Sequence, residues 1–171
     1  MSVANALLVD AFGRVKEVVH GAVEGLTREQ LTHRLDPEAN TIAWLVWHLT
    51  RIQDDHLADL ADTEQVWLQD DWVSRFGLPF PPAAHGYGHS SEDVAAVDVP
   101  PELLLDYHDA VHARTVSYVE SLRDEEYDDV VDRAWNPPVT RAVRLVSVVA
   151  DDLQHAGQAA FIRGVVLRLG K

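Results

Sequence analysis

Four long segments of this sequence repeat their apolar residues every three or four positions, which is the period of an α-helix. The segments cover roughly residues 4–26, 40–60, 101–122 and 141–169. No segment shows the alternation of apolar and polar residues that is typical of a half-buried strand. The chain has 171 residues, and a domain usually holds roughly 100–200. We therefore predict an all-α fold, a four-helix bundle that forms a single domain over residues 1–171.

Local signals refine the bounds of these helices. Asn40 is a residue type that caps helix N-termini well, so we predict that the second helix opens there. Pro100-Pro101 precedes the third helix, because proline suits the first helical turn. The fourth helix, from about Arg141 to Leu169, is apolar on most sides, as expected of a buried helix. One of its faces carries Val143, Val146, Ala150, Leu153, Gly157 and Ala160.

A long crossover connection, roughly residues 63–99, separates the second and third helices. It is rich in proline, glycine and aromatic residues, and it contains His85-Gly-Tyr-Gly-His89. Connections of this length without regular structure are usually functional or disordered. The aromatic residues favour an ordered loop that packs over the helices. A second turn, Trp135-Asn-Pro-Pro138, precedes the fourth helix.

The charge of the chain limits its partners. The net charge is −14, and residues 54–132 hold 20 of the 28 acidic residues. This excess of negative charge argues against a nucleic-acid partner, whose phosphates it would repel. The N-terminus has no basic stretch before its short apolar run, so no signal peptide is predicted. No run of 18 apolar residues is present to span a membrane. We predict a cytoplasmic protein.

Nine histidines and no cysteine leave imidazole and carboxylate as the available metal ligands. Asp151 and His155 are four residues apart, which places them on one face of the fourth helix, with Cβ atoms about 5–6 Å apart. His48 lies in an apolar part of the second helix. Two nitrogens and one oxygen from these residues would leave positions open, as in catalytic metal sites. The alternatives are a solvated Asp151 and His155 and a hydrogen-bonded core His48.

Other histidine pairs compete with this set. His108 and His112 have the same four-residue spacing, but their charged neighbours indicate a solvent-facing pair. His85 and His89 flank a glycine loop and are candidates for the mouth of a pocket.

Two arginines flank the fourth-helix candidates. Arg144 and Arg163 could each pair with a carboxylate of a substrate or cofactor. We favour structural salt bridges with the acidic middle segment for both.

The candidate residues lie in motifs that resemble a known family. The segments Asn40-Thr-Ile-Ala-Trp-Leu-Val-Trp-His48-Leu and Asp151-Asp-Leu-Gln-His155-Ala-Gly-Gln158 are similar to those of the DinB-like metalloprotein superfamily. This four-helix group contains mycothiol- and bacillithiol-dependent transferases, and the resemblance covers essentially the whole chain. It implies that His48 and His155 are ligands. Asp151 stands where many members have histidine and the mycothiol-dependent maleylpyruvate isomerases have glutamate. Asp152 competes for that role.

The resemblance also implies a function. It predicts a metal-dependent thiol S-transferase that joins mycothiol, or a similar low-molecular-weight thiol, to an electrophilic substrate. Zinc is the first expectation, and nickel, manganese and iron also suit imidazole and carboxylate ligands. A metal-dependent hydrolase on the same site and a non-enzymatic metal-binding stress-response module are the alternatives. The sequence leaves open the electrophile, the metal and the oligomeric state, for which a homodimer is one option.

Overall fold

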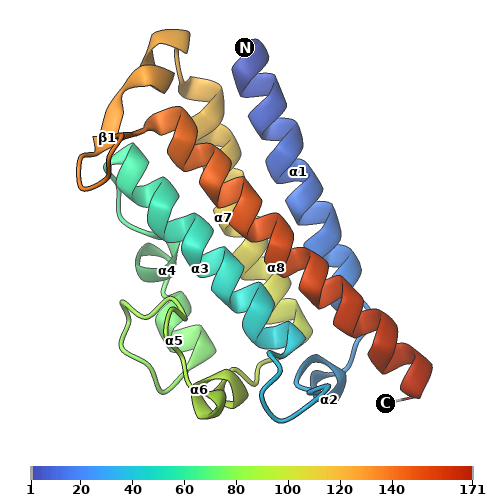
Figure 1. The fold of residues 1–171 in the computed structure, drawn as a ribbon. Helices are drawn as coiled ribbons and strands as arrows, with labels where there is room; N and C mark the ends of the chain where they lie inside the picture. The colour runs from blue at the N-terminus through green and yellow to red at the C-terminus, as the bar shows by residue number, and fades with distance from the viewer. Residues whose placement is uncertain (1, 171) are drawn as a thin grey trace.

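Four long helices lie side by side and make up most of the protein (Figure 1). The computed structural model describes residues 2–170, so Met1 and Lys171, the ends of the predicted domain, lie outside the described residues. The long helices are α1 (Val3–Val23), α3 (Ile42–Ala61), α7 (Pro101–Ser121) and α8 (Arg141–Leu169). The mostly helical structure confirms the predicted class, and the bounds of α8 agree with the prediction.

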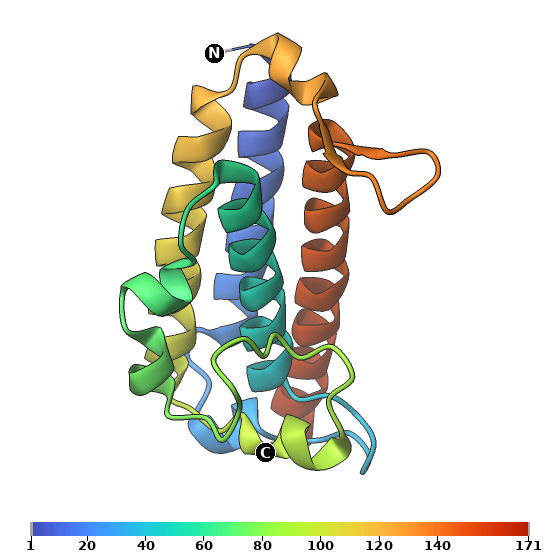
Figure 2. The ribbon, with the colours of Figure 1, turned by 90° about the vertical axis from the view of Figure 1, so that its left-hand side faces the viewer.

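The order of the helices explains the long connection. Helix α8 packs against α1 and α3, and α7 packs against the same two helices. Helices α3 and α7 run in the same direction, opposite to α1 and α8 (Figures 1 and 2). The chain must therefore return along the length of α3 before α7 begins, and residues 62–100 make this return.

This connection is ordered, and it contains three short helices that the sequence did not show. They are α4 (Val66–Gln69), α5 (Trp72–Phe76) and α6 (Ser91–Ala96). Trp67, Trp72 and Phe76 are buried in the core, as the aromatic content predicted. The buried carboxylate of Asp54 accepts the backbone N–H groups of Val66 (2.9 Å) and Trp67 (2.8 Å) and so fixes α4 against α3.

The remaining elements are short. Helix α2 (Arg28–Leu31) follows α1, and a 3₁₀ helix, η1 (Asp124–Asp128), follows α7. Strands β1 (Val130–Asp132) and β2 (Val139–Thr140) then pair antiparallel. The predicted turn at residues 135–138 is the loop between them. Elements of three and two residues are too short to show alternation, which is why no strand was predicted.

Two details of the helices correct the predictions. The N-cap of α3 is Thr41 rather than Asn40, because the Thr41 hydroxyl accepts the Trp44 N–H (3.0 Å). Helix α8 is also less buried than predicted, because only one of its apolar faces lies in the core. That face consists of Leu145, Val148, Asp152, Ala156, Ala159, Ile162 and Val166. The face that begins at Val143 and Val146 is exposed, although its residues are apolar.

Candidate metal centre

The structure brings together the three residues that the sequence singled out. His48 comes from the middle of α3, and Asp151 and His155 come from the facing side of α8. One ligand atom from each lies within 4.8 Å of the others, and among residues 2–170 this is the one such group of three histidine or acidic side chains. The His48 and His155 ring centroids are 4.9 Å apart, and His155 Nε2 is 3.6 Å from Asp151 Oδ1.

Hydrogen bonds orient both imidazole rings. His48 Nδ1–H donates to the carbonyl oxygen of His85 (2.5 Å), and His155 Nδ1–H donates to the amide oxygen of Gln158 (3.0 Å). A carbonyl or amide oxygen can only accept, so the proton of each neutral ring sits on Nδ1. The lone pair is then on Nε2, available for a metal ion. Burial lowers the pKa of His48, which favours this neutral form.

The carboxylates distinguish the two candidate acidic ligands. Asp151 Oδ2 and both carboxylate oxygens of Asp152 are buried without a hydrogen-bond partner, which is costly for an ionised oxygen unless a cation lies beside it. Position therefore distinguishes the two residues, because only Asp151 has an oxygen within reach of both His48 and His155. Asp152 is fully buried on the inner face of α8, outside the group of three, and burial raises its pKa well above the usual range. The geometry therefore favours Asp151. Two imidazoles and one carboxylate suit a divalent ion such as zinc.

The connection between α3 and α7 holds His48 in place from outside. Figure 2 shows its loop crossing the face of α3. Gly86 lies against the His48 ring with a φ of +101°, and a Cβ atom there would be 2.6 Å from His48 Nδ1. Only glycine therefore lets the His85 carbonyl reach the ring. The His48 ring also stacks on Trp44, with ring centroids 4.7 Å apart, and a Cβ atom at Gly86 would lie 3.1 Å from the Trp44 ring as well.

The role of this loop differs from the predicted one. His85 contributes its backbone carbonyl to the site, and the sequence gives no signal for a backbone contact. His89 packs between Trp47 and Phe80, with ring centroids 5.6 and 4.6 Å away. Its Nδ1 accepts the indole N–H of Trp44 (3.2 Å). The two histidines thus build the wall behind His48.

The contact at Gly86 gives the first testable prediction. Gly86→Ala should weaken metal binding by about 10–100-fold, the usual effect of removing a group that orients a ligand. The added methyl group must displace the His48 ring or the His85 carbonyl. Gly88→Ala, also at positive φ but with nothing near its Cβ position, is the matched control and should bind metal nearly as tightly as the natural protein. Equal affinities for the two variants, measured by competition with a chelator, would contradict this role.

The rival pair on α7 does not face solvent as predicted. His108 is fully buried and His112 is half-buried, and neither ring nitrogen of His108 has a hydrogen-bond partner. Burial lowers the pKa of His108 to about 3, so its ring is neutral. The charged residues that suggested exposure are neighbours in sequence, but a helix turns them to other faces. No acidic or histidine side chain among the described residues joins this pair into a group of three.

The two arginines fulfil one prediction and contradict the other. Arg144 forms the predicted salt bridge to the acidic segment, at 2.8 Å from Asp132. Arg163 instead donates to the backbone carbonyl of Glu24 (2.8 Å), so it joins the ends of α8 and α1.

A groove of about 510 Å³ lies along α8, and none of the three candidate ligands lines it. Gln158, whose amide holds His155, also lines the groove. Its other lining residues are Ala39, Asn40, Leu45, Gln154, Gly157, Phe161 and Ile162, none of which is charged. The groove therefore offers neutral amides and apolar surface, and Gln158 links it to His155.

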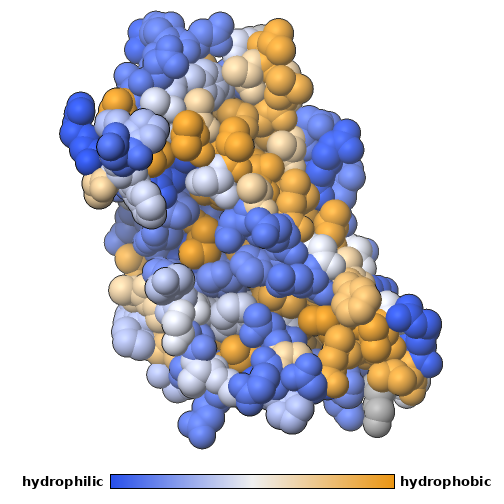
Figure 3. All heavy atoms as spheres, in the orientation of Figure 1, coloured by the Kyte–Doolittle hydropathy of each residue, from blue (hydrophilic) through white to orange (hydrophobic). Residues whose placement is uncertain are grey.

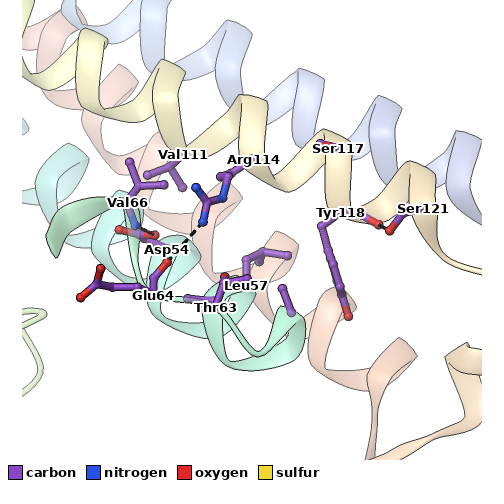
Figure 4. Close-up of a pocket in the computed structure, with 12 residues that line it drawn as sticks. Asp54, Leu57, Thr63, Glu64, Val66, Val111, Arg114, Ser117, Tyr118 and Ser121 are labelled. Atoms are coloured by element: carbon purple, nitrogen blue, oxygen red, sulfur yellow. Dashed lines mark hydrogen bonds between the residues drawn. The ribbon is translucent and has the colours of Figure 1, made fainter. Parts of the chain in front are cut away.

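A second cavity, of about 240 Å³, lies between α3 and α7 and contains none of these ligands (Figure 4). Its interior is apolar at Leu57, Val66 and Val111. Arg114 lies at its edge and donates to the side-chain oxygen of Gln69 (2.9 Å). Each helix of residues 2–170 is either too short or too polar to span a bilayer.

Comparisons with known proteins identify the family of this chain. The family model described as mycothiol S-transferase matches residues 7–166. A conserved protein from Enterococcus faecalis, solved as a crystal structure, is 34% identical, with a TM-score of 0.91 over 100% of this chain and 99% of its own. A search of curated proteins found no match. Because the family model covers almost the whole chain, this protein belongs to the mycothiol S-transferase family, a DinB-like group.

Proposed function

We propose that this protein is a metal-dependent thiol S-transferase that joins mycothiol, or a similar low-molecular-weight thiol, to an electrophilic carbon. In this proposal His48, Asp151 and His155 hold the metal, and residues 1–171 form one four-helix-bundle domain whose crossover covers His48. The observation that carries the proposal is the group of three ligands with an unpartnered, buried Asp151 oxygen, in a chain of this family.

The residues of the site suit a thiol cosubstrate. The chain has no cysteine, so the reacting sulfur must come from another molecule. A divalent ion, zinc first and nickel, manganese or iron as alternatives, would bind that sulfur and favour its thiolate form, which is the nucleophile. Two neutral imidazoles and one carboxylate balance only one of the two positive charges. The site therefore keeps a net positive charge that attracts an anionic sulfur.

Other residues near the proposed ligands orient the imidazole rings and provide room for the cosubstrate. His85 and Gln158 hold the two imidazoles in fixed orientations, and Trp44 stacks on the His48 ring. The groove along α8 is within the usual size of small-molecule sites, about 300–1,000 Å³. Its amide groups, on Asn40, Gln154 and Gln158, suit the neutral polar part of the thiol. We therefore place the non-reacting part of the cosubstrate there.

A conjugation assay tests the proposal. Metal-loaded protein is mixed with monobromobimane and mycothiol, with glutathione and cysteine as comparison thiols. We expect the enzyme to accelerate formation of the sulfur–carbon bond and release of bromide above the uncatalysed rate. His155→Ala should lose this acceleration, and His112→Ala should retain it. Hydrolysis of an ester such as p-nitrophenyl acetate without any thiol, and no thiol conjugation, would instead indicate a hydrolase. Tight metal binding with neither activity would favour the non-enzymatic module.

A further inference from the structure

The outer face of α8 is apolar although it is exposed. The exposed fractions are 54% for Val143, 61% for Val146, 40% for Leu153 and 66% for Phe161. Ala150, Gly157 and Ala160 are exposed between them. Figure 3 looks onto α8 and shows hydrophobic surface on it and over the first turns of α1, with hydrophilic side chains beside it in the middle of the helix. There Val3 and Leu7 are 78% and 66% exposed. We call these nine residues the α8 face.

The α8 face is also free of charge. Three charged residues lie between Val143 and Phe161 in the sequence, and all of them point elsewhere. Arg144 is bound to Asp132, Asp151 lies in the candidate metal centre, and Asp152 is buried. One quarter of the whole chain is charged, and its net charge is −14. An uncharged face of this length on such a protein is therefore unusual and indicates a surface that is covered.

The charge of the chain indicates which molecule covers the α8 face. Two copies of a protein with a net charge of −14 repel each other wherever their acidic surfaces meet. On the α8 face this repulsion is smallest, because neither copy presents a charge there. Large and small residues also alternate along the face, with Val146, Leu153 and Phe161 beside Ala150 and Gly157. In a twofold pair, large residues of one copy can fit against small residues of the other.

The dimensions indicate a modest interface. From Val143 to Phe161 the face is about 27 Å long, at a rise of 1.5 Å per residue. A helix is about 10–12 Å across, so α8 alone offers roughly 300 Å² in projection, and α1 adds to it. A standard interface buries about 800 Å² on each partner, so flanking polar residues must contribute as well. A pair of this kind should form and dissociate with protein concentration.

We propose that a second copy of this chain covers the α8 face, so that the protein is a reversible homodimer with α8 packed against α8 of its partner. Leu153 is two residues from both Asp151 and His155, which turns it about 160° away from each around the helix. The dimer contact and the metal centre therefore use different sides of α8. Gly157 and Phe161 belong both to the α8 face and to the groove, so the groove borders the contact.

Leu153→Arg tests this contact. Sedimentation of the natural protein between about 1 and 200 μM should show the mass rising from 19.1 kDa toward twice that value. Leu153→Arg should weaken the dimer at least about tenfold, because each copy would bury an unpaired charge. Leu68→Arg is a matched control, since Leu68 on α4 is also a half-exposed leucine (43%) and lies outside the α8 face. Its dimer should be unchanged, and all three proteins should bind metal equally.

Cysteine cross-linking gives a second, independent measurement. The chain has no cysteine, so any disulfide-linked dimer must come from an introduced thiol. Ala150→Cys, Leu153→Cys and Gly157→Cys should include at least one variant that cross-links rapidly under mild oxidation, while Leu68→Cys should not. The proposal is wrong if the natural protein stays at 19.1 kDa at every concentration. It is equally wrong if Leu153→Arg dimerises normally. Binding of the monomer to lipid vesicles through this face would also overturn it and would show another occupant.

Discussion

Replacement of either His48 or His155 by alanine should abolish stoichiometric metal binding and leave a helical protein. Each histidine is one of the three proposed ligands, and two remaining ligands would hold a divalent ion far less tightly. The fold depends much less on them, because His155 is partly exposed and the core of apolar residues around both helices remains. Metal content is measured by mass spectrometry on protein purified without a histidine tag, and helix content by circular dichroism.

Matched variants make this experiment decisive. Asp151→Asn should also lose the metal, whereas Asp152→Asn, the same change one residue later on the buried side of α8, should retain it. His112→Ala should retain it too, because His112 lies in the rival pair on α7. Unchanged metal content in both His48→Ala and His155→Ala would show that the ion, if bound, lies elsewhere.

Within one helix the sequence was a good guide to the site. Asp151 and His155 share a face because residues four apart in a helix always do, whatever surrounds them. The start of α7 at Pro101 and the bounds of α8 also follow from local rules. That His48 would meet them depends on how α3 packs against α8, which no local pattern specifies. The ligand chemistry made it one candidate, and the family resemblance favoured it.

The sequence failed where a feature depends on contacts between distant segments. Gly86 meets His48 across 38 residues of chain, so no local pattern reveals why it must be glycine. Helix α8 has apolar residues at helical spacing on two faces, and periodicity alone could not tell which one is buried. Neighbouring charges suggested that His108 is exposed, but the neighbours of a helical residue point in other directions.

Addition of mycothiol to the cobalt-substituted protein should produce a sulfur-to-cobalt charge-transfer band, which separates thiol transfer from hydrolysis. A thiol must lose its proton before its sulfur can bind a metal ion, so binding should release protons. Apparent affinity for the thiol should then rise by about tenfold per pH unit below the free pKa of the thiol and level off above it. Titration by absorbance at several pH values measures both effects.

The controls for this spectrum follow from the ligands. The band should be absent in His155→Ala, which lacks a ligand, and absent when the natural protein receives an S-methylated thiol, which has no proton to lose. Gly88→Ala should give the same band as the natural protein, because it leaves the site intact. A spectrum that ignores the thiol, together with ester hydrolysis that needs none, would contradict the transferase. The same three ligands would then activate water, and because the chain has no sulfur nucleophile of its own, hydrolysis would be the remaining chemistry for this metal centre.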